Sequence, residues 1–394
     1  MKDLKDKGVV VLLVSMILTL GVSLSESLCA SIRDGLFKKE TVSAKRKYNP
    51  PNRGLIKEIT QEGYIHKREK RWLNGKPAIV NTLIINPDKS NAIIKPSNAS
   101  YFINSIKSVR EIAHSEAAFA CINASYFKPD CGEPLGTYIV EGKVITGPLY
   151  KRVTIGITKD KKLKMDRINI GGSINIGNRT HLKLFNINQP VFSRIGFTIF
   201  TDKWGKRTPK TKPFYSHIVV AEGRVKYIKN SSVAIPYGGY VIVGPHSIVP
   251  KNIEKNDIVS YSTKLSPNDW NEVETAIGGG PYLIKNGKIF IDQENFSSKF
   301  LWDKAPRTAI GYTRSGVIIM VTVDGRRKGF SEGATLPELA HILYDLGAYN
   351  AMNLDGGSST QMVINGKLVN YPTVKGGSRV TNALVIISPV FAAQ

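Results

Sequence analysis

Short apolar runs separated by glycine-containing turns dominate the chain from Pro77 onward. Runs of four to eight β-branched and aromatic residues bounded by such turns are typical of strands. An Asn-Gly or Glu-Gly pair supplies the positive φ that a tight hairpin needs. We therefore predict hairpins at four turns, Glu141-Gly142-Lys143, Glu222-Gly223-Arg224, Asn286-Gly287-Lys288 and Asn365-Gly366-Lys367. Their unequal spacing argues against a solenoid or a propeller.

Helical patterns are few. Residues 105–114 form one candidate, and residues 336–346 form the clearest one, with Thr335 and Glu338 in a capping box and Pro337 in the first turn. The prediction is an α+β fold in which one large domain, residues 77–394, consists of mixed, mostly β, sheet with few helices.

The N-terminal pattern differs from the rest. Three lysines precede an apolar run from Gly8 to Leu24, which predicts a signal peptide or an N-terminal anchor over residues 1–30. Residues 31–76 hold 13 Lys/Arg against 5 Asp/Glu and predict a basic linker. The protein is therefore expected outside the cytoplasm, as a secreted, periplasmic or membrane-anchored chain.

Composition excludes a disordered chain and a polytopic membrane protein, because hydrophobic residues make up 42% and charged residues 22% of the 394. The net charge of +24 points either to an anionic partner or to a bias toward lysine. The linker could also lie against a membrane surface. Nucleic acid is disfavoured, because the lysine-rich stretch 151–167 contains no aromatic residue to stack on bases.

Two cysteines remain when Cys29 is assigned to the signal segment. An even pair in an exported chain predicts a disulfide between Cys121 and Cys131. No zinc motif is present. No cofactor is required by the sequence, and a divalent cation at an Asp-Gly loop is left open.

Two Asp-Gly pairs end strands that we expect to be parallel. The strand Val317–Val323 ends at Asp324, a helix follows, and the strand Ala351–Leu354 ends at Asp355. A crossover of this kind places both strand ends at one edge of the sheet. Neighbouring strands would hold the two carboxylates about 5 Å apart, and one intervening strand would hold them about 10 Å apart.

Glycine-rich segments surround these aspartates. The stretch Gly356-Gly357-Ser358-Ser359-Thr360 could form a nest of N–H and hydroxyl groups for a phosphate. The loop Gly278-Gly279-Gly280-Pro281 would let a ligand approach the backbone. Arg307, Arg326 and Arg379 lie beside glycine-bearing motifs, and arginine binds phosphate through two parallel contacts.

Six motifs in order give the chain a resemblance to the phosphodiester glycosidase family over about residues 115–388. They are Asn123-Ala124-Ser125-Tyr126-Phe127, Gly278-Gly279-Gly280-Pro281, Arg307-Thr308-Ala309-Ile310-Gly311, Val323-Asp324-Gly325-Arg326, Asn353-Leu354-Asp355-Gly356-Gly357-Ser358-Ser359-Thr360 and Arg379-Val380-Thr381-Asn382-Ala383-Leu384. Ala124-Ser125 replaces the two glycines usual in the first motif, and Ser378 stands where an acidic residue often precedes the last.

The resemblance implies an exported hydrolase that cleaves the sugar C1–O bond of a sugar-1-phosphodiester, in an anionic, phosphate-bearing glycan of the envelope or extracellular polysaccharide. Asp355 is the expected nucleophile or base, and Asp324 is its partner or a substrate anchor. Substrate contacts are expected from Asn123, Arg307, Arg326, Gly279, Gly280, Gly356, Gly357, Ser358, Ser359, Thr360, Arg379 and Asn382. The alternative is a module of the same fold that binds the glycan without cleaving it.

Overall fold

A computed structural model of the chain describes residues 53–61, 63–178 and 180–388. The predicted signal or anchor over 1–30, and the part of the predicted linker up to residue 52, lie outside these ranges. Within them, no helix has both the length and the apolar character needed to cross a membrane.

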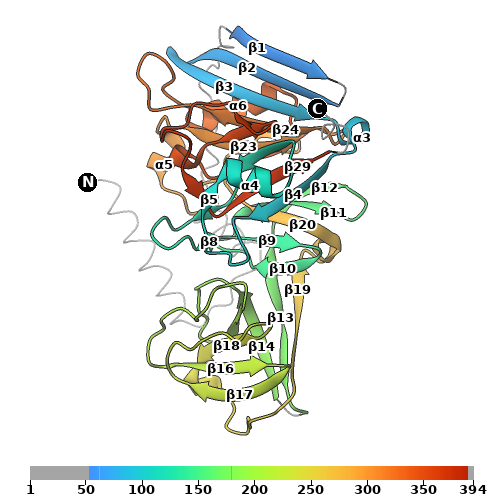
Figure 1. The fold of residues 1–394 in the computed structure, drawn as a ribbon, viewed down its shortest axis with the longest axis vertical. Coiled ribbons are helices and arrows are strands. Elements are labelled where there is room, and N and C mark those ends of the chain that lie inside the picture. The colour runs from blue at the N-terminus through green and yellow to red at the C-terminus, as the bar shows by residue number, and fades with distance from the viewer. Residues whose placement is uncertain (1–52, 62, 179, 389–394) are drawn as a thin grey trace, which may run out of the picture. The chain divides into compact units, whose positions relative to one another are not determined.

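An eight-stranded antiparallel sheet begins earlier than the sequence predicts (Figure 1). Strands β1 and β2 occupy residues 53–73, and β2 pairs along its whole length with β3. The structure thus has two paired strands where the sequence predicts a linker, and Tyr64, His66, Arg71 and Leu73 of β2 are buried. In sheet order the strands are β1 (Arg53–Gln61), β2 (Tyr64–Leu73), β3 (Lys76–Ile85), β24 (Ile318–Val323), β23 (Arg307–Tyr312), β25 (Asn350–Asn353), β21 (Tyr282–Lys285) and β22 (Lys288–Ile289).

A five-stranded antiparallel sheet packs against one face of this sheet. Buried side chains from both sheets, among them Leu83, Met320, Ile122 and Leu384, form one hydrophobic cluster. The strands of the second sheet, in order, are β27 (Lys367–Leu368), β26 (Met362–Ile364), β6 (Ala120–Asn123), β29 (Asn382–Ile387) and β4 (Ile93–Asn98).

A further five-stranded sheet contributes Ile155 and Ile277 to the same cluster. Its strands, in order, are β10 (Lys143–Thr146), β9 (Tyr138–Val140), β20 (Val273–Gly278), β11 (Val153–Thr158) and β12 (Leu163–Arg167). Two short pairs complete this region, β28 (Arg379–Val380) with β5 (Lys107–Ser108) and β7 (Tyr126–Phe127) with β8 (Pro134–Leu135).

Helices cover the outer faces of the two main sheets. The helix α6 (Leu336–Asp345) has the predicted Thr335–Glu338 capping box and packs its apolar face on the eight-stranded sheet beside α5 (Ser298–Trp302). The helix α4 (Val109–Ser115) packs on the far face of the β6 sheet. It begins later than the predicted residue 105, because Ser108 caps it with Glu111. The short helix α3 (Pro87–Ser90) joins β3 to β4.

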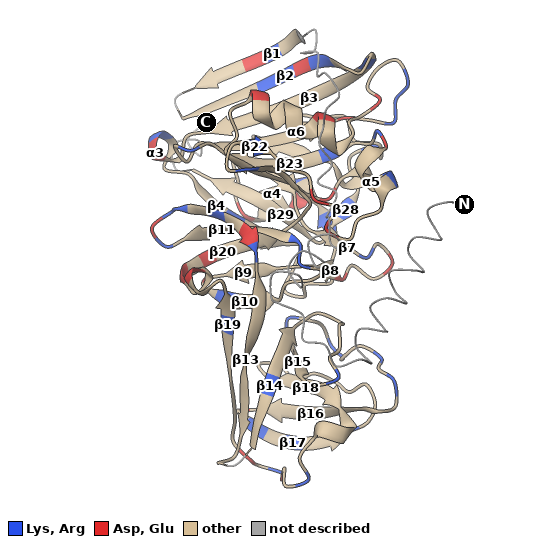
Figure 2. Ribbon diagram, turned by 180° about the vertical axis from the view of Figure 1, so that it is seen from behind, with Lys and Arg blue, Asp and Glu red and all other residues tan. Residues whose placement is uncertain are grey.

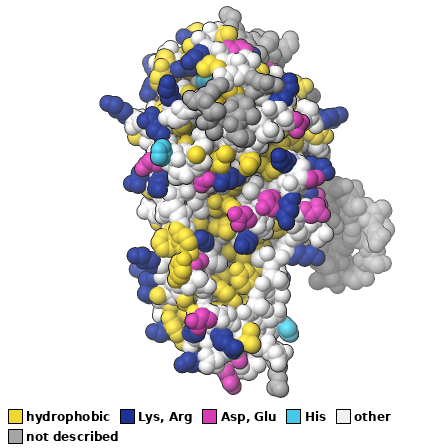
Figure 3. Space-filling model, turned by 45° about the vertical axis from the view of Figure 1, so that its right-hand side comes forward, with side chains coloured by type: hydrophobic (Ala, Val, Ile, Leu, Met, Phe, Trp, Pro, Cys, Tyr) yellow, Lys and Arg dark blue, Asp and Glu magenta, His cyan; other side chains and the backbone are white. Residues whose placement is uncertain are grey.

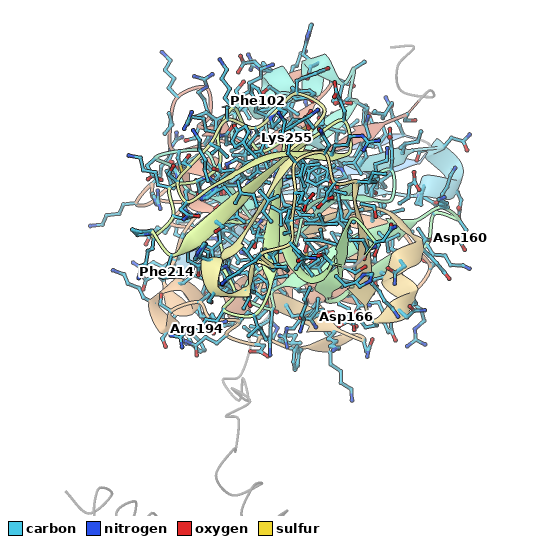
Figure 4. The ribbon with its side chains drawn as sticks, turned by 90° about the horizontal axis from the view of Figure 1, so that it is seen from below. Phe102, Asp160, Asp166, Arg194, Phe214 and Lys255 are labelled. Carbon is cyan, nitrogen blue, oxygen red and sulfur yellow. The ribbon has the colours of Figure 1, made fainter. Side chains whose placement is uncertain are left out.

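A seven-stranded mixed sheet is inserted between β12 and β20. One face is lined by Ile174 and Phe197, and the other face is lined by Phe200 and Val241. Its strands, in order, are β17 (Arg224–Lys229), β16 (Tyr215–Ala221), β18 (Tyr240–Pro245), β15 (Phe197–Thr201), β14 (Thr180–Ile187), β13 (Asn169–Ile176) and β19 (Val259–Ser266). The 3₁₀ turns η1 (His246–Ile248) and η2 (Asn268–Glu272) flank β19. Figure 4 views this sheet from below, with the exposed Phe214 at its rim.

The α+β prediction is confirmed, and so are the four hairpins, whose Gly142, Gly223, Gly287 and Gly366 all have positive φ. The strands β24 and β25 are parallel to each other, because each pairs antiparallel with β23 between them. Of the two spacings left open by the sequence, the wider one applies: Asp324 and Asp355 follow strands that are about 10 Å apart.

The predicted disulfide is absent. Cys121 is a free thiol inside β6, fully buried beneath α4, whereas Cys131 is a free, exposed thiol in the turn after Lys128. The β6 pairing on both sides fixes Cys121 in the sheet, so the short sequence separation does not bring the two sulfur atoms together.

Lysine and arginine are distributed over all parts of the described chain (Figure 2). On the face shown in Figure 3 they stand singly or in small groups among neutral and acidic side chains. This face has no continuous basic surface, which favours compositional bias over a broad polyanion-binding face there.

Candidate active site

Asp355 lies where the chain leaves one sheet of the sandwich for the other. The N–H of Leu354 still bonds to the carbonyl of Thr308 in β23 (2.8 Å), and the N–H of Asp355 bonds to the carbonyl of Ala124, just past β6 (2.9 Å). The short turn η3 (Gly357–Ser359) follows. Both main sheets therefore fix the backbone that carries the aspartate.

Asn123 holds this crossing together. Its amide nitrogen donates to the carbonyl of Asp355 (2.6 Å), and its amide oxygen accepts from the Thr308 hydroxyl (2.8 Å) and the Gln361 N–H (3.1 Å). The side chain is fully buried. Asn123 was expected to bind a sugar hydroxyl, but these contacts make it a positioning residue for the Asp355 loop.

The surroundings of the Asp355 carboxyl group shift its pKa. Burial raises its pKa from 3.8 to about 7, against the opposing effect of hydrogen bonds from Ser359 and from the Gly356 N–H (2.9 Å). Burial favours the neutral acid because the charged form loses its hydration. A carboxyl that titrates near neutrality is suited to proton transfer.

Tyr126 is a neighbour that the motif contained but that we did not single out from the sequence. Its hydroxyl donates to the carbonyl of Gly280 (2.8 Å) and accepts from the amide of Asn353 (2.6 Å). Burial, and then the charge of Asp355, raise the pKa of the phenol. Tyr126 thus connects the Asp355 strand to the Gly279-Gly280 turn.

Arg152 is a second residue that sequence reasoning missed. Its guanidinium carbon lies 3.9 Å from the ring centre of Phe296, 5.1 Å from that of Tyr126 and 5.0 Å from that of Tyr150. Burial lowers its pKa. No glycine-rich motif surrounds Arg152, so only the fold brings this cation to Tyr126.

The Gly278–Pro281 turn makes the close approach that its glycines predict, but to protein groups. A Cβ on Gly279 would lie 2.6 Å from the carbonyl oxygen of Asn353, and one on Gly280 would lie 2.4 Å from a carboxylate oxygen of Glu294. The Gly280 N–H bonds to the Asn353 carbonyl (2.7 Å). These glycines hold β25 in place beside the turn.

The arginines divide into two kinds. Arg307 is buried and donates to the carbonyls of Ala334, Phe300 and Asp303, and burial lowers its pKa to about 10. Arg326 is exposed and has φ 61°. Its Nη2 would lie 3.1 Å from a Cβ on Gly357, so this guanidinium covers the Asp355 loop.

At the predicted phosphate nest, Gly356–Thr360, four backbone N–H groups already have protein acceptors. The N–H groups of Gly356, Gly357, Ser359 and Thr360 bond to Asp355, Pro306, Gly356 and Gly357, respectively. The loop closes on itself as a 3₁₀ turn, so these four donors point to protein acceptors. Ser358 is partly exposed at the top of the turn.

Asp324 is almost fully buried, with 1% of its surface exposed. One carboxylate oxygen accepts from the Asn370 amide (3.0 Å) and the Tyr371 N–H (2.9 Å). Burial raises its pKa to about 6. Asp324 anchors the segment after β27 and, across β23, is not placed to share a substrate atom with Asp355.

A residue of the last motif forms a hydrogen bond to the first motif. The amide oxygen of Asn382 accepts from the Ser125 N–H (2.8 Å), and the Ser125 hydroxyl donates to the carbonyl of Gly278 (3.2 Å). The serine that replaces a glycine thus gains its own partner. Arg379 is exposed, pairs through β28 with Ser108, and its charge acts on Glu111 of α4.

No group of three or more His, Cys, Asp or Glu side chains within the described ranges is arranged to hold a metal ion. Within these ranges the open alternative of a cation at an Asp-Gly loop therefore gains no support.

Residues 216–387 match the family model described as phosphodiester glycosidase. The chain is similar to the phosphodiester glycosidases, as its motifs predict. The match contains Asp324, Asp355, Arg307 and Arg326. Asn123, Tyr126 and Arg152 precede it and complete the site from the N-terminal side.

A curated relative gives the same result over a shorter stretch. N-acetylglucosamine-1-phosphodiester alpha-N-acetylglucosaminidase of Mus musculus is 38% identical over 108 residues, which are 25% of this chain and 20% of that protein. The human protein of that name is 35% identical over 108 residues, with 25% and 21% covered. The alignments span only about a fifth of the length of these relatives.

The fold is also known. A hypothetical protein from Synechocystis has a TM-score of 0.76 and 27% identity, covering 87% of this chain and 64% of its own. This likeness places the phosphodiester glycosidase motifs on a known architecture.

Proposed function

We propose that the protein hydrolyses the C1–O bond of a sugar-1-phosphodiester, with Asp355 as the carboxylate that acts at C1. The observation that carries the proposal is the Asp355 carboxyl with its pKa near 7, on a loop that Asn123 fixes between two sheets and that Arg326 meets at Gly357. The family match supports the reaction class, and the name of the mouse relative suggests the first substrate to test.

The chemistry needs only one tuned carboxyl group. The departing phosphomonoester has a second pKa near 6, so it leaves as a stable anion with the bonding electrons and needs no strong acid. Asp355 either removes a proton from the water that attacks C1 or attacks C1 itself, after which water hydrolyses the glycosyl ester. Retention or inversion at C1 distinguishes the two routes.

The remaining groups have supporting roles in this proposal. Arg326 and Arg152 stabilise the negative charge that develops on the departing phosphate, because a fixed cation costs no reorganisation during the reaction. Asn123 holds the Asp355 backbone, and Tyr126 holds the side chain of Asn353, two residues before it. The wide separation of Asp324 from Asp355 leaves Asp324 a positioning role.

We also propose export as the setting, since the N-terminal pattern predicts a signal or anchor. The substrate would then be an extracytoplasmic glycan that carries phosphodiesters.

The test determines whether the C1–O bond or the P–O bond of the substrate is broken. The protein is incubated with an N-acetylglucosamine-1-phosphodiester in water enriched in oxygen-18. The proposal expects free reducing sugar with the label on the sugar. Label on the phosphate would identify a phosphodiesterase instead. Binding of the diester without release of sugar would identify a non-catalytic glycan-binding module.

A further inference from the structure

The loop after β24 is tied down at its base and presents its middle to solvent. Ser331 is fully buried, accepts from the N–H of Ile79 (2.8 Å) and donates to the carbonyl of Asp324 (2.6 Å). The N–H groups of Arg327 and Ser331 each bond to the other residue's carbonyl (3.0 and 2.8 Å). These hydrogen bonds fix the backbone conformation of the loop, so its exposed side chains are not needed to hold it.

Those exposed side chains are cations and a phenyl ring. Arg326, Arg327 and Lys328 follow one another, and Phe330 is 41% exposed. Among the described residues, none of the three cations forms an ion pair. Two arginines elsewhere in the fold do form ion pairs, Arg71 with Glu69 (2.8 Å) and Arg167 with Glu294 (2.9 Å).

A fourth cation comes from β2. The guanidinium carbon of Arg68 lies 4.2 Å from the ring centre of Tyr371, and that of Arg327 lies 5.5 Å from the same ring. Phe330 meets Tyr371 edge to face at 5.4 Å, and Tyr371 is 42% exposed. Arg68, Arg327, Phe330 and Tyr371 are called the outer cluster below.

The buried Asp324 is an anion close to the two arginines of the outer cluster. The charges of Arg68 and Arg327 lower the pKa of Asp324, against the larger effect of its burial. Its carboxylate bonds to the Asn370 amide and the Tyr371 N–H instead of to either arginine. It thus holds the Tyr371 backbone, and among the described residues neither guanidinium group forms an ion pair.

Two consecutive arginines of the loop contact different parts of the protein. Arg326 reaches the Asp355 loop at Gly357, whereas Arg327 donates to the carbonyl of Pro372 (3.2 Å) beside Tyr371. A chain with phosphate at regular intervals matches this arrangement, because one phosphate at Arg326 places its neighbour along the polymer toward the outer cluster. Exposed aromatic rings provide apolar faces for the sugar between them.

We infer that the outer cluster is a second subsite, which binds the next phosphate and sugar of a polymeric sugar-phosphodiester whose scissile unit lies at Asp355. The inference rests on the proposed function and extends it: the substrate is a repeating phosphodiester glycan. Two guanidinium groups over one tyrosine bind a phosphate oxygen by charge-assisted hydrogen bonds.

The experiment compares Arg68→Gln with the unchanged protein on two substrates, an N-acetylglucosamine-1-phosphodiester with one phosphate and an oligomer of the same unit with several. We expect the ratio of kcat/KM for the oligomer to kcat/KM for the single diester to fall about tenfold, the value of one charge-assisted contact. Phe330→Ser, at a solvent-facing position, should lower the same ratio. An unchanged ratio in both variants overturns the inference.

Arg314→Gln is the matched control. Arg314 also lies over a tyrosine, at 4.8 Å from the Tyr349 ring centre, but it follows the opposite end of β23 from Arg307. Its ratio should equal that of the unchanged protein. A similar fall of the kcat/KM ratio in Arg314→Gln would show that loss of any positive charge has this effect. That result would overturn the subsite.

A binding measurement separates this inference from the proposed function. If neither substrate is cleaved, the proposed function fails, and calorimetry with the oligomer still tests the cluster. Weaker binding by Arg68→Gln, with a shallower dependence of Kd on salt, supports the subsite. Equal Kd values, or equal binding of a vesicle with anionic lipids and of the oligomer, contradict it.

Discussion

The side-chain amide of Asn123 donates a hydrogen bond to the backbone carbonyl of Asp355 over 2.6 Å. The two residues are 232 positions apart: Asn123 ends β6 in one sheet, and Asp355 follows β25 of the opposing sheet. The same amide accepts from Thr308 and Gln361, so three chain segments meet at one side chain. The position of the proposed catalytic carboxyl therefore depends on a buried amide that need not touch the substrate.

Replacing this amide should affect both stability and turnover. Asn123→Ala leaves the Thr308 hydroxyl and the Gln361 N–H without their acceptor, which costs about 1–3 kcal/mol of unfolding free energy. Because the Asp355 loop loses its anchor, kcat should fall more than KM rises. Denaturant unfolding and steady-state kinetics measure the two effects.

A double-mutant cycle with Thr308→Val checks that the contact is the cause. The coupling energy between the two positions should be about 0.5–3 kcal/mol. Additive effects would contradict the three-segment contact.

The rate should rise with pH through about 7. Asp355 acts as a carboxylate in either proposed route, and its pKa is raised to about 7, so kcat/KM should drop as pH falls below that value. The pH dependence of kcat/KM for the single diester measures this. A rate that falls as pH rises through 7 would show that Asp355 acts as an acid.

Asp355→Asn should stabilise the fold, and more so at higher pH. The folded protein holds the Asp355 proton up to about pH 7, whereas the unfolded chain releases it near 3.8. The folded state thus loses stability as pH rises between these values, and the variant is free of this loss. The difference in Tm between variant and unchanged protein should be smallest near pH 4 and largest above pH 7. A difference independent of pH would mean that the Asp355 pKa is not raised.

The cysteines can be tested directly, in a Cys29→Ser background. Without a reductant, a thiol reagent should modify the exposed Cys131 at once and the buried Cys121 only after unfolding. Mass spectrometry counts the adducts. If no thiol reacts until a reductant is added, the two cysteines form the disulfide that the sequence predicts.

Local signals account for what the sequence predicts well. The capping box at Thr335 and Glu338 and the Asn-Gly turns depend on neighbouring residues, so helix α6 and the hairpins follow from short stretches. The motif order places Asp355 and Arg326 in one region. The parallel strands follow from chain topology, but the β23 strand between them does not.

Long-range contacts account for what it misses. Arg152 reaches the site only because β11 lies beside β20, and Arg68 only because β2 joins the large sheet. The basic composition of 31–76 conceals two strands, since four of the ten residues of β2 are Lys or Arg and one of these, Arg71, is fully buried. The Gly356–Thr360 stretch looks like a phosphate nest because sequence does not show that its N–H groups bond within the loop.

The most direct measurement of the account is turnover of an N-acetylglucosamine-1-phosphodiester by Asp355→Asn, beside the unchanged protein and Asp324→Asn. The amide keeps the shape of the side chain but neither attacks C1 nor takes a proton. We predict that Asp355→Asn lowers kcat by about a hundredfold to ten-thousandfold, the usual contribution of such a group, and that Asp324→Asn has a smaller effect. Turnover by a folded Asp355→Asn at the rate of the unchanged protein would contradict the role of Asp355.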